Sequence, residues 1–320
     1  MALSDLAVFS EYVYSSMTEV LRQNVALFNQ ASGGTILLQS AAHQGDYSDE
    51  AFWKNISGLV RRRNAYGSGT VAEVNMQHLV DTMVKVAAGT PPVRLDPGEM
   101  NWIQRSQEER GAALGRQLAV STLADMVNIA IGCGVTALSN DSEIITDVTG
   151  ATAPADQPSF INLNTAQAKF GDRSGEILAW VMHSTTLHKL YGNALNNSER
   201  LFTYESVNVA RDPFGKLLIM TDSAQLVSGT TYNTLGLVSG GLRVDQNNDF
   251  DDNFDTSNGD ENIIRTYQAE WSYNLGVKGY SWDKTNGGKS PTNAALLTST
   301  NWDRYATDKK DLAGVLLKTH

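Results

Sequence analysis

The sequence predicts an α+β fold, and three observations support this prediction. Segments with apolar residues at every third or fourth position occur together with shorter apolar, β-branched runs, which indicates both helices and strands. These elements do not follow the regular strand–helix–strand rhythm of a parallel sheet. With 320 residues, 41% of them hydrophobic, the chain is long enough to bury a large core.

The first third of the chain is expected to begin with a helix and to continue into an extended excursion. Apolar residues recur at helical spacing through residues 3–31, where a Ser-Gly-Gly sequence ends the pattern. A short strand follows at residues 35–39, and residues 46–60 could form a short helix. Residues 64–94 have few strong apolar anchors, so we expect a long projecting hairpin whose edges could pair with another segment.

An unusually long helix is expected next. Asp96 can cap it, Pro97 suits the first helical position and Glu99 the third, and no proline follows as far as Ala137. About forty residues at 1.5 Å each give a helix of roughly 55–60 Å, which is longer than a compact domain usually contains. Its first half is charged and its second half apolar, so we expect it to leave its own core and lie on another surface.

The second half of the chain is expected to mix helices and strands. A loop with Pro154 and Pro158 precedes a helical pattern at residues 165–191. The remaining expected elements are strands at 215–222, 231–244 and 263–283, an acidic loop at 245–261, a short helix at 293–303 and a last strand at 312–319.

The net charge of −10 argues against non-specific binding to nucleic acid or to an anionic membrane. The single cysteine, Cys133, cannot form an intramolecular disulfide, which indicates a reducing compartment. The N-terminus lacks the basic segment of a signal peptide, and residues 123–138 are too short and too polar to span a bilayer. We therefore expect a soluble protein made in the cytosol.

No spacing in the sequence matches a catalytic or metal-binding motif. The five histidines are not spaced as zinc ligands, the glycine runs do not match nucleotide-binding loops, and GxSxG is absent. We expect no enzyme activity, no catalytic residue, no cofactor and no metal. The acidic segment contains Asp249, Asp251, Asp252 and Asp255 but lacks the glycine of a calcium loop; a solvated loop and a looser cation site stay open as alternatives.

The only run of three basic residues is Arg61, Arg62 and Arg63. Their guanidinium groups could bind carboxylates in a bidentate manner at a subunit boundary, and a solvated turn is the alternative. Composition does not decide between the two.

Five segments in order carry a resemblance to a known family. They are an acidic and aromatic stretch followed by the arginines (45–66), the long helical segment (97–133), a Gly-Asp followed by Met-His-Ser (166–192), the strand at 215–223, and a closing stretch with Ser-Pro-Thr-Asn, Asn-Trp, a lysine pair and an apolar strand (290–319). Together they resemble the major capsid proteins of tailed bacteriophages with the Hong Kong 97-type fold.

That resemblance implies a division of the chain. It places an N-terminal arm at 1–62, the extended loop at 63–96, the spine helix of the peripheral domain at 97–139, an axial domain at 140–305 and, at 306–320, a C-terminal strand that returns to the peripheral domain. The residues expected at subunit contacts are Arg61, Arg62, Arg63, Lys85, Arg94, Trp102, Arg105, Glu108, Glu109 and Arg110.

The resemblance also implies a structural function. Hexamers and pentamers of the chain would assemble into the icosahedral head of a tailed phage, in the cytoplasm of the host bacterium, and enclose double-stranded DNA without sequence-specific binding. Expected partners are further copies of the chain, a portal and, as an open question, a decoration protein; no membrane is involved. Because the chain begins directly with the arm helix, we expect a separate scaffolding protein rather than a fused one.

Two details stay open at this point. Some relatives join subunits through a Lys–Asn bond, and Lys85 is the only lysine of the expected extended loop, although we favour an ordinary exposed lysine. Residues 245–261 carry seven acids and no base, and we place them, as a hypothesis, in the axial domain near the centre of the capsomer. The alternative functions are an encapsulin-like compartment shell and, from another class, a soluble α+β hydrolase.

Overall fold

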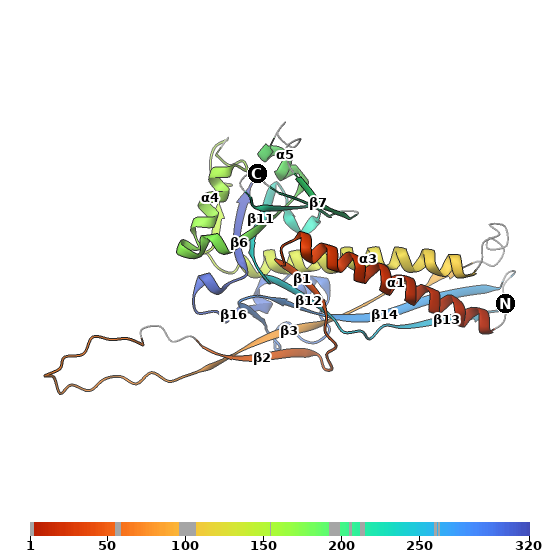
Figure 1. Ribbon diagram of the computed structural model, residues 1–320, viewed down its shortest axis with the longest axis horizontal. Coiled ribbons are helices and arrows are strands. Elements are labelled where there is room, and N and C mark those ends of the chain that lie inside the picture. Colours follow the sequence, from red (N-terminus) through yellow and green to blue (C-terminus); the bar gives the residue numbers. More distant parts are fainter. Residues whose placement is uncertain are drawn as a thin grey trace.

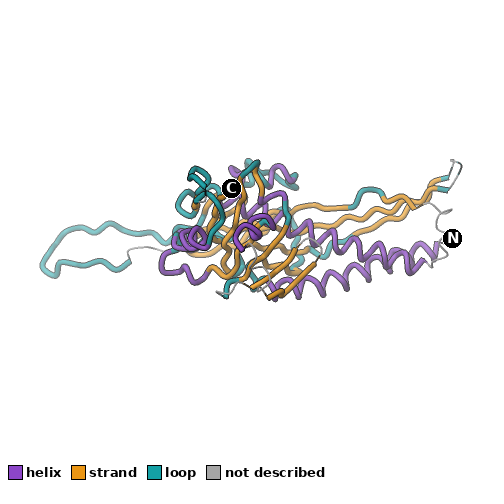
Figure 2. Tube along the Cα trace, turned by 90° about the horizontal axis from the view of Figure 1, so that it is seen from above, coloured by secondary structure: helices purple, strands orange, loops and turns teal. Residues whose placement is uncertain are grey.

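The computed structural model of the chain is an elongated molecule with a central body and two projections (Figures 1 and 2). It describes residues 3–54, 59–95, 107–153, 155–191, 199–204, 207–211, 215–258, 261 and 263–320. A long loop leaves the body at one end, and two helices leave it at the other, together with a pair of long strands.

Helices and strands are mixed, as the predicted α+β class requires. The helices are α1 (Leu3–Ala31), α3 (Gln107–Leu138), α4 (Phe160–Ala168), α5 (Ser184–Tyr191) and α6 (Asn293–Leu296). The strands are β1 (Ile36–Ser40), β2 (Tyr47–Trp53), β3 (His78–Gly89), β4 (Val93–Leu95), β5 (Ile145–Asp147), β6 (Ile177–Met182), β7 (Glu199–Tyr204), β8 (Val207–Arg211), β9 (Leu217–Thr221), β10 (Val227–Ser228), β11 (Thr231–Val238), β12 (Leu242–Gln246), β13 (Asp251–Ser257), β14 (Ile264–Val277), β15 (Tyr280–Trp282), β16 (Trp302–Arg304) and β17 (Gly314–Thr319).

The two long helices lie side by side and form one of the projections (Figure 1). Phe9, Val13 and Met17 of α1 are buried against α3. A Cβ atom on Gly115 of α3 would lie only 2.5 Å from the carbonyl oxygen of Val13, so the two backbones touch at this point. Glycine is therefore required here by a close approach of backbones, and not by a turn.

The first sheet has nine strands and supports the same projection. Its main order is β1-β12-β14-β15-β16, and the long strand β14 pairs with β12 and β13 as well as with β3 and β4. Strand β2 pairs only with β3 among the described strands, so the two form a ribbon that leads into the projecting loop.

The second sheet has eight strands in the order β5-β17-β11-β6-β9-β8-β7, with β10 beside β11. Helix α3 lies between the sheets and contacts both, which makes it the centre of the core. Its segment Glu109–Leu138 is long and apolar enough to cross a membrane, but 67% of the relevant window is buried inside the protein, as expected of a core helix.

Three predicted elements are wrong. Residues 47–53 form strand β2 and not a helix, because they pair in antiparallel register with β3. The expected helix at 165–191 divides into α4, a 3₁₀ turn, β6 and α5, since β6 lies between β9 and β11 and is buried on both faces. Within the expected acidic loop, Asp251–Ser257 form strand β13, which pairs with β14.

Of the short helix expected at 293–303, only Asn293–Leu296 form an α-helix (α6), and strand β16 begins at Trp302. Helix α1 ends where the Ser-Gly-Gly sequence follows, with Gly33 at a φ of 63° and the amide of Gly34 bonded to the carbonyl of Asn29. The start expected for the long helix, at residues 96–106, lies outside the described residues. The segment expected as axial domain contributes strands to both sheets, and β17 lies in the eight-stranded sheet; the division into capsid domains stays a prediction.

Candidate assembly surfaces

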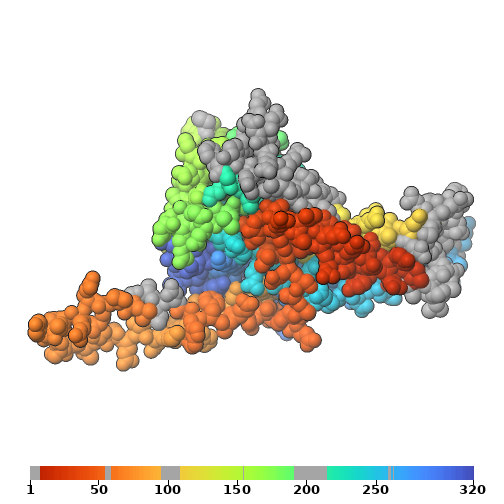
Figure 3. All heavy atoms as spheres, viewed as in Figure 1, coloured from red at the N-terminus to blue at the C-terminus, as the bar shows by residue number. Residues whose placement is uncertain are grey.

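The projecting loop has no core of its own. Its described residues 59–77 form neither helix nor strand, and the side chains are exposed, with Val60 at 91% and Tyr66 at 100%. Figure 3 shows this segment extending beyond the rest of the molecule. Because this segment buries almost none of its side chains in its own chain, packing within the chain contributes little to its conformation, and its surface is available to a second molecule.

Arg61, Arg62 and Arg63 lie in this loop and are fully available to a partner. All three are exposed, and no ion pair joins them to any residue that the structure describes. This arrangement is compatible both with the clamp and with the solvated turn that the sequence left open. Their role at a subunit contact stays a prediction.

The root of the loop, in contrast, is fixed to the body by ion pairs. Lys284 Nζ lies 2.6 Å from Asp49 Oδ2, and Lys289 Nζ lies 2.7 Å from Asp46 Oδ2. Burial acts to raise the pKa of Asp49, but the hydrogen bonds from Lys284 and from Thr82 outweigh it and lower that pKa. A third acid of the same segment, Glu50, lies 3.6 Å from Arg243. All three acids therefore form ion pairs with bases that are far away in the sequence.

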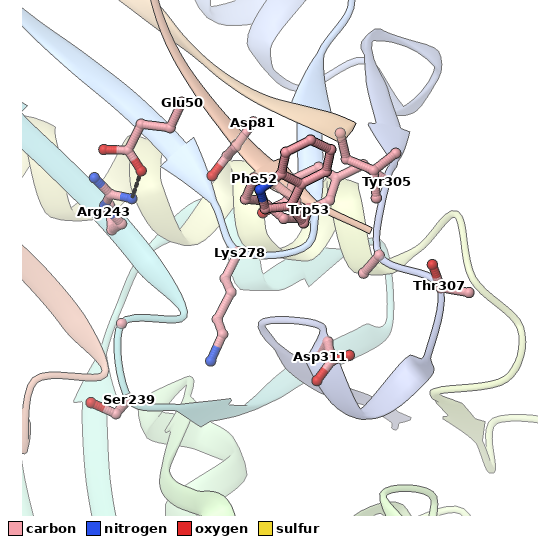
Figure 4. Close-up of a pocket in the computed structure, with 13 residues that line it drawn as sticks. Glu50, Phe52, Trp53, Asp81, Ser239, Arg243, Lys278, Tyr305, Thr307 and Asp311 are labelled. Carbon is pink, nitrogen blue, oxygen red and sulfur yellow. Dashed lines mark ion pairs between the residues drawn. The ribbon is translucent and has the colours of Figure 1, made fainter. Parts of the chain in front are cut away.

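A cavity of about 580 Å³ opens beside this root (Figure 4). The ring of Phe52 packs on that of Tyr305 with centroids 5.1 Å apart, and Trp53 lies beside them. The side chain of Asp81 points toward this group, and burial raises its pKa to about 6 although Tyr305 and Arg243 act in the opposite direction. The root therefore contains a carboxyl group, that of Asp81, whose charge changes just below neutral pH.

The ribbon of β13 and β14 has two different faces. Toward α1, Phe254 and Tyr267 surround the ring of Phe9, with centroids 5.4 Å and 5.9 Å away. On the opposite face, Asp251 stands directly across from Glu270, and Asp255 follows two residues further along that face. Like charges in a cross-strand pair destabilise a sheet, and no ion pair joins these acids to a described base.

The four acids singled out in the sequence do not converge on one point. Asp252 faces α1 and accepts a hydrogen bond from Ser10 at 2.5 Å, whereas Asp249 accepts hydrogen bonds from Ser272 and lies 3.7 Å from Lys85. Within the part of the chain that the structure describes, no three His, Cys, Asp or Glu residues are grouped as metal ligands.

The other candidate contact residues are dispersed. Lys85, within the expected extended loop of residues 63–96, lies in β3 where this strand pairs with β14, and its Nζ lies 3.5 Å from the carbonyl oxygen of His43. Arg94 is in β4, in register with Thr266. Glu109 and Arg110 are in the first turn of α3. Trp102 and Arg105, and the side chain of Glu108, lie outside the described residues.

Helix α1 presents a second exposed surface. It runs along one face of the molecule (Figure 3), where Tyr12, Tyr14 and Leu27 are 42%, 49% and 53% exposed.

The sequence analysis did not identify the residues at the root of the loop, above all Asp81, Arg243 and Tyr305. The one available signal was the group of acids at positions 46, 49 and 50, which needed bases from elsewhere in the chain.

Comparison with known proteins agrees with this geometry. The family model described as major capsid protein 13-like (Gp13-like) matches residues 5–316. The structure is similar to the capsid of cyanophage Pam1 (TM-score 0.53, 10% identity, covering 89% of this chain and 88% of that one). It is also similar to the capsid of Ralstonia phage GP4 (TM-score 0.53, 11% identity, covering 90% and 88%). No curated protein matches the sequence at a significant level.

Proposed function

The chain belongs to the major capsid protein 13-like family, and on that premise we propose that copies of it join as hexamers and pentamers into an icosahedral phage head. Its role is that of a structural capsid protein with a Hong Kong 97-type fold. The arrangement into hexamers and pentamers, and the partners inside and outside the shell, are our proposal.

One observation carries the proposal: the exposed loop at residues 59–77 projects from one end of an elongated body. If the exposed loop of one copy binds a different surface of the next copy, the contact between the two copies is heterologous. Heterologous contacts close into rings when the rotation between copies allows it, and rings of five and six can close a shell.

The charge of the chain suits an enclosing wall better than a DNA-binding surface. The net charge is −10, and seven of the acids lie in residues 245–261. We propose that the shell encloses double-stranded DNA without sequence-specific binding, since a surface of this charge offers little counterion release. A separate scaffolding protein, a portal, a possible site for a decoration protein and assembly in the host cytoplasm complete the proposal.

The experiment is to express the chain and examine it by sedimentation and electron microscopy. We expect icosahedral particles, or free hexamers and pentamers that convert into particles when a scaffolding protein is added. A matched variant replaces residues 59–77 by a short Gly-Ser linker and should stay monomeric with an unchanged circular-dichroism spectrum. A wild-type chain that remains a monomer under both conditions would overturn the proposal.

The two alternative functions predict different results in the same experiment. A soluble α+β hydrolase would be a monomer or small oligomer, and the loop deletion would not alter its size. An encapsulin-like shell would form particles with a cargo enzyme bound inside; the family match favours the phage head over this alternative.

A further inference from the structure

Strand β3 has a free edge inside the body of the molecule. On one side, its residues Val84–Gly89 pair with β14; on the other, pairing with β2 ends at Val84. The amide of Lys85 still donates to the carbonyl of Asp46 at 3.0 Å, and beyond it no described strand continues the sheet. Because backbone groups alternate in direction along a strand, the N–H and C=O groups of Ala87 and Gly89 point to this empty side.

Both faces of the sheet are hollowed next to this edge. On the side of Lys85 and Ala87 lies a cavity of about 350 Å³ whose lining includes Asp46, Asp249 and Glu270. On the side of Val86 and Ala88 lies a cavity of about 530 Å³. Its lining includes Leu114, Leu118 and Tyr273, and also Thr122, which is 2% exposed and whose hydroxyl has no described partner. A strand added to this edge would place its side chains alternately in the first hollow, called the acidic hollow below because three acids line it, and in the second, which is mostly apolar.

The acidic hollow is not neutralised by its own chain. Asp46 pairs with Lys289, and Asp249 lies near Lys85, but no ion pair joins Glu270 to a described base. Asp251, across from Glu270 on the neighbouring strand, has none either. A cationic side chain entering this hollow would therefore gain an uncompensated carboxylate and relieve a like-charge pair.

The chain contains a segment of complementary character, at residues 59–63. Its sequence, Leu-Val-Arg-Arg-Arg, is exposed, lacks a described ion pair and is neither helix nor strand. In a strand, Leu59, Arg61 and Arg63 would share one face, and Val60 and Arg62 the other. The second hollow can receive both of the latter, because its lining includes Asp125 as well as Leu118. The same chain does not bring it to the edge. Strand β2 pairs with β3 from Val84 to His78 and so leads away from that edge by about 20 Å at 3.3 Å per residue, and the loop continues outward.

We propose that residues 59–63 of one copy add as a strand to the edge Lys85–Gly89 of a second copy, with Arg61 and Arg63 in the hollow lined by Glu270 and Val60 in the hollow lined by Leu118. Backbone hydrogen bonds provide the affinity and the two hollows provide the register, as in other cases of strand addition. Pro91 and Pro92 follow this edge and have no N–H group to donate, so they limit the length of strand that can pair with it. This inference rests on the proposed function, because it names the surface that receives the loop.

Disulfide trapping tests the contact directly. Chains with Ala87→Cys are mixed with chains with Arg61→Cys or Arg63→Cys, assembled and oxidised; Cys133 is buried and does not interfere. Facing residues of neighbouring strands are close enough for a disulfide, so we expect a dimer band on a non-reducing denaturing gel in at least one mixture. Arg62→Cys is the matched control, because its side chain would point to the opposite face and should give at least fivefold less dimer.

A second measurement removes the interaction without cysteines. Ala87→Pro deletes an N–H that β14 does not use, so it should leave the melting temperature of the isolated chain unchanged but lower the yield of particles at least tenfold. Ala87→Ser keeps the N–H and should assemble within twofold of the wild type. Arg61→Glu with Arg63→Glu should match the proline variant, and adding Glu270→Lys should restore at least part of the yield.

The outcomes separate the inference from the proposed function. If wild-type particles form, while the mixtures give no dimer and Ala87→Pro assembles normally, the strand contact is wrong and the capsid function stands. If dimers form but no particle does, the contact stands and the hexamer-and-pentamer shell is wrong. If neither dimers nor particles form, both are wrong.

Discussion

The two projections of this molecule differ in how their residues are packed. In the helical projection, α1 is docked on α3 so closely that a glycine is needed between their backbones. In the loop, the side chains of Val60 and Tyr66 are 91% and 100% exposed. The difference indicates that the helical projection is packed by contacts within the chain, whereas the loop keeps its surface available to a partner.

The largest effect on stability is expected from a substitution that separates α1 from α3. Gly115→Ala should destabilise the chain by about 2–4 kcal/mol, because the added Cβ would lie 2.5 Å from the carbonyl oxygen of Val13 and the helices would have to separate. Helix propensity alone predicts the opposite sign, a gain of about 1 kcal/mol. Urea unfolding measures the difference, with Gly150→Ala, whose Cβ meets no atom within 4 Å, as the control. A stabilised Gly115→Ala chain would contradict the docking.

The root of the loop should show an intermediate, pH-dependent effect. The pKa of Asp81 is raised to about 6, well above its unfolded value near 3.9, so its charged form opposes folding above pH 6 and the cost disappears as the pH falls through that value. Asp81→Asn should therefore stabilise the chain by about 1–2 kcal/mol at pH 8 and by almost nothing at pH 4. Thermal unfolding across this range measures it, and an equal effect at both pH values would show that charge is not the cause.

A smaller effect is expected from one ion pair at the root. Lys284→Met removes the partner of Asp49, but both side chains are nearly half exposed, so the loss should be about 0.5 kcal/mol. The effect should shrink further in 1 M salt, because screening weakens such pairs. Lys54→Met is the comparison, since no ion pair of Lys54 to a described residue exists; equal losses would mean that the ion pair contributes nothing.

The smallest effect on the isolated chain should come from the tip. Tyr66→Ser removes a side chain that is fully exposed, so the melting temperature of the monomer should not change measurably. The melting temperature of assembled particles should fall, because there the side chain has a partner to lose. A change in the monomer alone would show that the tip folds back on its own chain.

Local patterns in the sequence were sufficient for much of the fold. Helix α1, the strands at 217–221 and 314–319 and the weakly apolar loop follow from periodicity and turn residues that need no distant partner. The resemblance of five ordered segments was sufficient for the family. What failed was the choice between helix and strand for β6, whose apolar run is buried on both faces and so carries no alternation to read.

The surfaces were harder to predict than the elements. Asp46, Asp49 and Glu50 form ion pairs with Lys289, Lys284 and Arg243, about two hundred residues away, and no local pattern reveals such partners. The triple arginine could be identified from composition alone, because an exposed loop without neighbours is described almost completely by its own residues.

The position of β17 has a consequence for the timing of synthesis. This strand, residues 314–319, lies between β5 and β11, so the eight-stranded sheet lacks one of its strands until these residues have been synthesised. Pairing over such a sequence separation is slow, and a nascent chain cannot complete it early. A chain that ended before residue 314 would therefore leave both β5 and β11 without the strand that lies between them.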